Sequence, residues 1–205
     1  MQTLNTKVLG LGSVVLVATL FLSGLSPYDR ATWIMEVLPV MMALPVLWLT
    51  GRRFPLTTLV YAVIVLHGLV LIYGGAYTYA RVPLGFELQQ WLGTARNPYD
   101  KIGHLMQGFA PALVAREILI RGAFVRGPRM LVFLVLCIVL AISAVYELIE
   151  WAAAVAMGEG ADEFLGTQGD EWDSQSDMLF ALIGGATALL LLSRAHDAQI
   201  ARLRR

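Results

Sequence analysis

Long apolar stretches separated by short polar segments dominate this 205-residue sequence. A helix needs about 20 mainly apolar residues, with a range of about 17 to 25, to cross the hydrocarbon core of a bilayer. Six stretches meet this requirement: 8–25, 31–49, 56–76, 102–120, 130–157 and 177–193. Runs such as 132–140 lack the alternation of transmembrane strands. The pattern therefore predicts an all-α, polytopic membrane protein with six transmembrane helices in one domain.

Composition supports a membrane protein and excludes several other classes. Hydrophobic residues make up 58% and charged residues 15% of the chain, whereas about a quarter of the residues in a soluble domain are charged. The net charge is zero, so no basic excess points to a nucleic-acid partner. The first apolar stretch is too long for a cleaved signal and no A-x-A site follows it, so we expect a retained helix.

Basic residues are distributed unequally between alternate polar segments, and short loops rich in Lys and Arg stay in the cytoplasm. One set of segments holds Lys7, Arg52, Arg53, Arg116, Arg121, Arg126, Arg129, Arg194, Arg202, Arg204 and Arg205. The opposite set holds Arg30, Arg81, Arg96 and Lys101. We therefore predict six crossings with both termini in the cytoplasm.

Two outward-facing segments follow from this orientation. The segment between the fifth and sixth apolar stretches has no Lys or Arg and contains Glu159, Asp162, Glu163, Asp170, Glu171 and Asp173. Its glycines and aromatic residues favour a segment that folds back over the bundle, although a solvated loop is the simpler alternative. The other outward-facing segment, 77–101, lies between the third and fourth apolar stretches. Apolar and polar residues interleave there over 86–92, which predicts a short interfacial helix.

Most ionisable residues in or beside the apolar stretches fall near the outer ends of their helices; Glu117, near an inner end, and His67, near the middle of the third stretch, do not. Asp100 and His104 share a helix face, and Ser143, Glu147 and Glu150 form one stripe. Glu36 and Asp177 complete the set of outer polar residues: Glu36, Asp100, His104, Gln107, Ser143, Glu147, Glu150 and Asp177. Because ionisable residues in a membrane are costly, a shared depth in four helices indicates a site.

Two kinds of chemistry fit these side chains. One imidazole with several carboxylates can hold a divalent transition metal. The proposed ligands are His104, Glu147, Glu150 and Asp177, with Glu150 also a candidate general base and Asp100 a catalytic residue that orients the imidazole. Metal-assisted hydrolysis or group transfer on a lipid or envelope intermediate is then the expected function. Alternatively, Glu147 and Glu150 relay protons in a proton-coupled transporter.

A third alternative is a non-catalytic scaffold in which the polar cluster is a closed network, with Arg81, Arg96 and Lys101 as counter-charges. Three further expectations are structural. Glu117 should form an interfacial ion pair with Arg116 or Arg121, and His67 should be a hydrogen-bonded core residue. Small residues in the sixth stretch predict close helix packing: Ala181, Gly184, Gly185 and Ala188.

Four strings connect the chain with a known family: NPYDKIGH at 97–104, ALVAREIL at 112–119, YELIEW at 146–151 and GTQGDEWDSQSD at 166–177. In these strings the chain closely resembles the YjdF-type family of bacterial inner-membrane proteins. The resemblance covers nearly the whole chain and implies a multi-pass inner-membrane protein, without implying an activity.

A looser resemblance is to the VanZ-like membrane proteins. It depends on the D-K-x-x-H run that begins at Asp100, on Glu147, and on Asp177 with Gly184 seven residues later. The VanZ-like pattern has an asparagine at Ala181 and a glutamine at Glu150. This resemblance implies only an outward-facing polar site.

Overall fold

The computed structural model describes residues 2–157 and 168–203, and every regular element in these ranges is an α-helix. The helices are α1 (Gln2–Leu25), α2 (Arg30–Gly51), α3 (Thr58–Ala76), α4 (Pro83–Leu92), α5 (Tyr99–Arg121), α6 (Pro128–Met157) and α8 (Asp173–Leu203). The all-α prediction is confirmed. Each of the six predicted apolar stretches coincides with one long helix, and several helices extend beyond the predicted ends.

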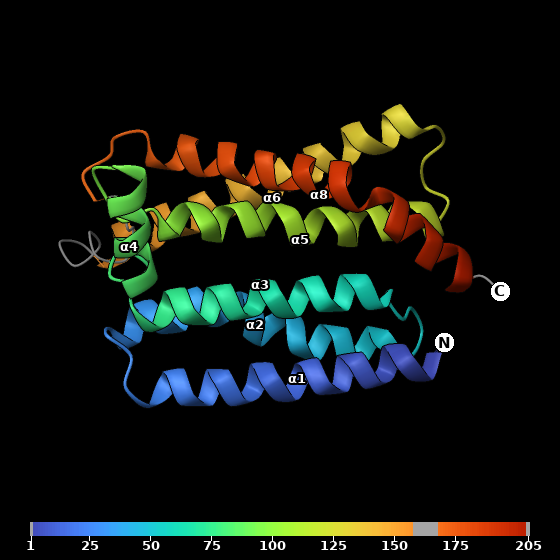
Figure 1. Cartoon of the computed structure of the whole chain (residues 1–205), viewed down its shortest axis with the longest axis horizontal. Coiled ribbons are helices and arrows are strands. Elements are labelled where there is room, and N and C mark those ends of the chain that lie inside the picture. The colour runs from blue at the N-terminus through green and yellow to red at the C-terminus, as the bar shows by residue number, and fades with distance from the viewer. Residues whose placement is uncertain (1, 158–167, 204–205) are drawn as a thin grey trace.

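The long helices form two groups that run roughly side by side (Figure 1). Helices α1, α2 and α3 pack on one another, as do α5, α6 and α8, and the contact between α3 and α5 joins the groups. Helix α4 lies across one end of the bundle, and both ends of the chain lie at the opposite end (Figure 1). The short helix predicted around residues 86–92 is thus present.

By length and composition, five of these helices can cross a membrane: α1, α2, α3, α6 and α8. Helix α5 has 23 residues but carries charged side chains near both ends. It packs against α3, α6 and α8, and Arg116 and Glu117 on it are buried inside the protein. Protein contacts therefore surround this less apolar helix.

Local hydrogen bonds determine where several helices begin. The Asp29 side chain accepts a hydrogen bond from the Thr32 backbone N–H and caps α2, and Thr57 caps α3 in the same way through Val60. Helix α4 begins at Pro83, where a proline costs no helix hydrogen bond. These caps satisfy donors that would otherwise lack partners in an apolar surrounding.

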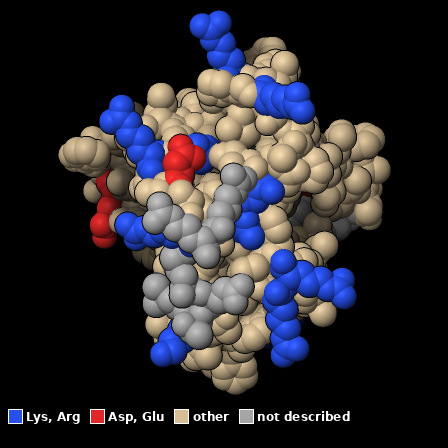
Figure 2. Space-filling view, turned by 90° about the vertical axis from the view of Figure 1, so that its right-hand side faces the viewer, with Lys and Arg blue, Asp and Glu red and all other residues tan. Residues whose placement is uncertain are grey.

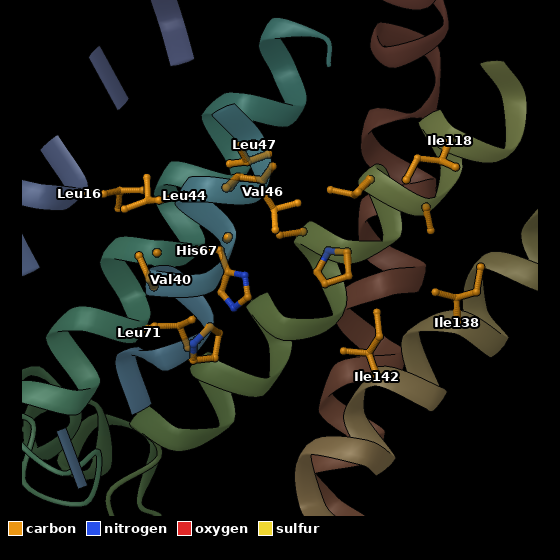
Figure 3. A pocket seen from close by; sticks show the side chains of 18 of the residues that line it. Leu16, Val40, Leu44, Val46, Leu47, His67, Leu71, Ile118, Ile138 and Ile142 are labelled. Carbon is orange, nitrogen blue, oxygen red and sulfur yellow. The ribbon is translucent and has the colours of Figure 1, made fainter. Parts of the chain in front are cut away.

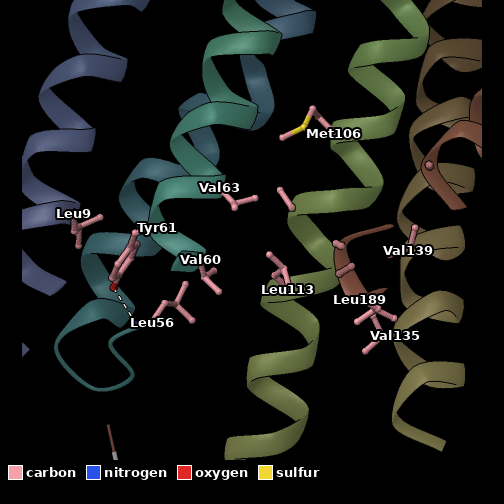
Figure 4. Packing of buried hydrophobic residues seen from close by; sticks show 14 residues of the cluster. Leu9, Leu56, Val60, Tyr61, Val63, Met106, Leu113, Val135, Val139 and Leu189 are labelled. Atoms are coloured by element: carbon pink, nitrogen blue, oxygen red, sulfur yellow. Dashed lines mark hydrogen bonds between the residues drawn. The ribbon is translucent and has the colours of Figure 1, made fainter. Parts of the chain in front are cut away.

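One of two buried apolar clusters in the described part of the chain extends across both groups of helices (Figure 4) and lies toward the end that holds the chain termini. Leu113, Val60 and Val135 are fully buried there. The Leu56 backbone N–H donates a hydrogen bond of 3.2 Å to the hydroxyl oxygen of Tyr61. Large apolar side chains also point outward, such as Leu190 with an exposed fraction of 84%, which is the surface expected to face lipid tails.

Helices α5 and α8 approach so closely that their backbones touch. A Cβ atom at Gly108 would collide with the carbonyl oxygen of Ala181, and one at Gly184 would collide with that of Leu105. Only glycine fits at such positions. The predicted packing through the small residues of α8 is confirmed, and it brings α8 against the middle of α5.

The structure modifies the expectations for Glu117 and His67. Glu117 pairs with Arg121 at 2.6 Å, as predicted, but it is fully buried and also accepts hydrogen bonds from Thr57 and His196. Arg116 contacts Asp197 and not Glu117. The prediction that His67 is hydrogen-bonded was wrong within residues 2–157 and 168–203, because its buried Nε2 has no partner there.

Candidate functional site

Near the end of the bundle covered by α4, polar side chains line a chamber of about 170 Å³. They come from α2, α3, α5, α6 and the turn after α3: Glu36, His67, Tyr79, Asp100, His104, Gln107, Tyr146 and Glu150. So many ionisable groups are rare among spanning helices, because each one is costly to bury. We call this space the polar chamber.

Three side chains on α5 and α8 converge beside the polar chamber. His104 Nε2 lies 3.3 Å from Asp100 Oδ1 and 3.7 Å from Asp177 Oδ2. One donor atom from each of the three residues lies within 4.8 Å of the others. Two ligands bound to a tetrahedral ion at about 2.1 Å are about 3.4 Å apart. The two distances from His104 Nε2, 3.3 and 3.7 Å, are close to this value, so the three residues are candidate ligands for a divalent transition metal.

Gln107 contacts the other nitrogen of the same imidazole. His104 Nδ1 lies 3.2 Å from Gln107 Oε1, an oxygen that can accept a hydrogen bond from an Nδ1–H group. With the hydrogen on Nδ1, the lone pair of Nε2 points toward the two aspartates. This is how a neighbouring group orients a metal-binding histidine. Asp100, which the sequence suggested for that role, lies on the Nε2 side of the ring instead.

Lys101 holds the oxygens of these aspartates that point away from the imidazole. Its Nζ lies 2.6 Å from Asp177 Oδ1, 2.7 Å from Asp173 Oδ1 and 3.8 Å from Asp100 Oδ2. The oxygens close to His104 are Asp100 Oδ1 and Asp177 Oδ2. Asp100 and Asp177 thus each contact the lysine with one oxygen and leave the other oxygen beside the imidazole.

Arg96 extends this network beyond the membrane-spanning segments. Its Nη2 contacts Asp173, and the same atom lies 3.1 Å from Asp170 Oδ2. Burial acts to lower the pKa of Arg96, but the hydrogen bond and charge of Asp173 outweigh it and raise that pKa. Arg96 and Lys101 therefore place two positive charges at the first turns of α5 and α8.

The two predicted glutamates on α6 lie on different sides of the site. Glu150 lines the polar chamber. Glu147 Oε1 lies 3.8 Å from His104 Nδ1, on the side of the ring that faces away from Asp100 and Asp177, and this buried oxygen has no hydrogen-bond partner among the described residues. Of the four predicted ligands, His104 and Asp177 belong to the converging group, whose third member is Asp100. The predicted acids Glu159, Asp162 and Glu163 lie outside the described residues.

Sequence reasoning missed two tyrosines of the chamber. Tyr146 donates a hydrogen bond of 3.2 Å to Glu36 Oε2 and connects α6 with α2. Tyr79 follows α3 with a φ of 51°, and its ring lies where a Cβ at Gly74 or Gly103 would be. Tyr146 lies three residues after Ser143 and next to Glu147 of the predicted polar stripe, and this position could have indicated it. Tyr79 could be placed only from the geometry of the turn after α3.

Comparison with known proteins gives the family. Residues 9–198 match the family described as "Predicted membrane protein (DUF2238)". The inner membrane protein YjdF of Escherichia coli strain K12 is 56% identical over 201 residues, which cover 98% of this chain and 96% of that protein. No solved structure matches the chain. These matches do not reach the VanZ-like proteins, so that resemblance stays a prediction. The chain belongs to the DUF2238 family of predicted membrane proteins and is an integral inner-membrane protein.

Proposed function

We propose that the protein is a membrane-embedded, metal-assisted hydrolase or group-transfer enzyme that acts on a lipid or envelope intermediate. One observation carries the proposal: donor atoms of Asp100, His104 and Asp177 converge within 4.8 Å, beside a chamber that contains two further carboxylates, Glu36 and Glu150. A metal bound by three protein ligands keeps a position for water or substrate. Lys101 would hold Asp100 and Asp177 through the carboxylate oxygens that point away from His104.

In this proposal Glu150 is the general base. It lines the chamber together with Asp100 and His104, and a carboxylate in such a place can take a proton from a metal-activated water. Glu36, held by Tyr146 at 3.2 Å, lies in the same chamber and would orient the substrate. Glu147, on the far side of His104, would act on the imidazole and not on the metal.

The proposal includes six membrane crossings with both termini in the cytoplasm. Helix α5 has 23 residues and is about 34 Å long, which matches a hydrocarbon core about 30 Å thick. The end of the bundle that holds the termini presents many Lys and Arg side chains and few acidic ones (Figure 2). Because basic ends stay in the cytoplasm, the polar chamber would lie toward the outer face.

Reporter fusions test the orientation. A topology reporter fused after Arg205 should report a cytoplasmic location, and one inserted near Gly166 should report a location outside the cytoplasm. The opposite pair of results would overturn the outward placement of the chamber.

Turnover tests the enzymatic proposal. Purified protein, loaded with Mn²⁺ or Zn²⁺, is incubated with an inner-membrane lipid extract, and products are followed by mass spectrometry. We expect Glu150→Gln to abolish the products while metal binding is kept. The control is Glu87→Gln, because Glu87 is exposed on α4 and does not line the chamber. Equal product formation by the wild type, Glu150→Gln and a metal-free sample would refute the proposal.

One observation counts against the proton-transport alternative. A large apolar cavity extends inward from the chamber, and His67 is its one ionisable lining residue within the described part of the chain. The next buried ionisable groups inward are Arg116, Glu117 and His196. Glu117 and His196 bond to each other at 2.9 Å, and Arg116 contacts His196. A proton path would have to cross this apolar region, whereas a lipid-handling enzyme can use it.

A further inference from the structure

A large apolar groove lies between the two groups of helices, deeper in the bundle than the polar chamber. Its volume is about 490 Å³, which is within the usual range of ligand sites, about 300 to 1,000 Å³. On one side it is lined by Leu16, Val40 and Leu44, and on the other by Ile118, Ile138 and Ile142. Figure 3 shows these two sets facing each other with His67 between them. We call this space the apolar groove.

The apolar groove and the polar chamber adjoin each other. Five residues line both spaces: Pro39, His67, Leu71, Pro111 and Ile142. One end of the combined space therefore offers carboxylates, imidazoles and tyrosines, and the other end offers only hydrocarbon apart from His67. Along α5, the groove runs from Ala110 to Leu119, which is about 14 Å. A head-and-tail molecule matches this division of chemistry.

The junction between the two spaces contains one buried side-chain atom without a partner among the described residues and one helix carbonyl that lacks its usual donor. The buried His67 Nε2 has no partner within residues 2–157 and 168–203. Pro111 lacks an N–H group, so the Gln107 carbonyl loses its usual helical donor. Such groups are costly in an apolar surrounding unless a ligand or water bonds to them. They lie where the polar part of a lipid would join its chain.

We infer that the apolar groove holds the hydrocarbon chain of a membrane lipid whose polar group occupies the polar chamber, with His67 donating a hydrogen bond to the carbonyl that links them. This inference names the substrate class of the proposed enzyme and so depends on the site described above. Its two parts are separable, because the groove residues are not among the groups that converge on the candidate metal position.

Photo-crosslinking tests the inference. The protein is placed in lipid nanodiscs that contain phosphatidylethanolamine with a diazirine near the end of one acyl chain, and crosslinks are mapped by mass spectrometry. We expect crosslinks at Ile118 and Ile138 of the groove. Ala43→Trp fills the groove and should reduce them about tenfold, whereas crosslinks at the outward-facing Leu190 and Leu191 should not change.

The matched control is Ala141→Trp, because Ala141 is exposed on α6 and does not line the groove; it should leave the groove crosslinks intact. Replacing the ester-linked chain by an ether-linked one removes the carbonyl. This change should weaken crosslinking in the wild type but not in His67→Leu. Groove crosslinks that are absent, or equal in Ala43→Trp and Ala141→Trp, would overturn the inference.

Metal binding measured on the same samples separates the two proposals. Metal binding without groove crosslinks leaves the metal site standing and refutes the lipid chain. Groove crosslinks without metal binding refute the metal enzyme and leave the lipid-binding groove.

Discussion

His104 Nε2 on α5 lies 3.7 Å from Asp177 Oδ2 on α8, although the two residues are far apart in the sequence. The backbone contact at Gly108 and Gly184 makes this approach possible, because no side chain separates the two helices there. The electrostatic network of Lys101 then crosses the same interface through Asp173 and Asp177. The geometry of the candidate metal site therefore depends on the packing of α5 on α8.

Gly184→Ala should disrupt this packing. The added methyl group would overlap the Leu105 carbonyl oxygen, which is backbone and cannot move aside. We expect a loss of about 3 kcal/mol in the free energy of unfolding in micelles, the upper part of the range for overpacked sites. At the neighbouring Gly185, a Cβ would meet Val139 side-chain atoms at 3.1 and 3.3 Å, so Gly185→Ala should cost clearly less. Equal effects would contradict the proposed backbone contact.

His67→Leu should not destabilise the protein. The imidazole has a buried nitrogen without a partner in the described part of the chain, and such a group costs about 1 to 3 kcal/mol. We expect the free energy of unfolding to stay the same or to rise by about 1 kcal/mol. The control is His196→Leu, which removes contacts with Glu117 and Arg116 and should cost about 3 kcal/mol. A comparable loss in His67→Leu would show that His67 has a structural partner.

Lys101→Met should destabilise the protein by about 3 kcal/mol, because it removes the cation between Asp173 and Asp177, both of which are buried. Adding Asp173→Asn to this variant removes one of the two carboxylates that lost the lysine and should restore a small part of the loss, because Asp173 keeps its contact with Arg96. Unfolding of the wild type, both single variants and the double variant gives the coupling energy directly. A coupling near zero would mean that Lys101 does not hold these two aspartates together.

The Asp29 cap predicts a dependence on pH. Hydrogen bonds from Thr32 lower the pKa of Asp29 below its ordinary value of 3.8. The cap is therefore fully stabilising above that value, and its contribution is lost as the pH falls through the lower pKa of the folded state. Asp29→Ala should cost about 1 kcal/mol near neutral pH, and the difference from the wild type should shrink in strong acid. Asp29→Asn keeps a capping oxygen and should show little change with pH.

Much of this architecture could be predicted from the sequence, because charge-free stretches and helical spacing are local signals. The i and i+4 spacing of Asp100 and His104 placed both on one face of α5, where they contact each other at 3.3 Å. The shared depth of polar residues also pointed to α8, and Asp177 lies beside His104. These inferences needed only helix geometry and the cost of burying charge.

The roles within the site could not be predicted in the same way. Depth does not determine rotation about the helix axis, so the sequence could not show that Glu147 faces Nδ1 of His104 while Asp177 faces Nε2. The placement of Tyr79 depends on a left-handed turn and on space left by two glycines. The two closest partners of Lys101, Asp173 and Asp177, come from α8, and the distance between α8 and α5 is a tertiary property.

Metal binding to two matched variants tests the central claim most directly. Asp177 and Asp173 are both buried, both on α8 and both bonded to Lys101, but only Asp177 belongs to the group that converges on His104. Detergent-purified protein is equilibrated with Zn²⁺ or Mn²⁺, and bound metal is measured by elemental analysis. The account predicts about one equivalent in the wild type and in Asp173→Asn, and a loss of binding in Asp177→Asn. Less than about a tenth of an equivalent in the wild type, or equal binding by both variants, would contradict it.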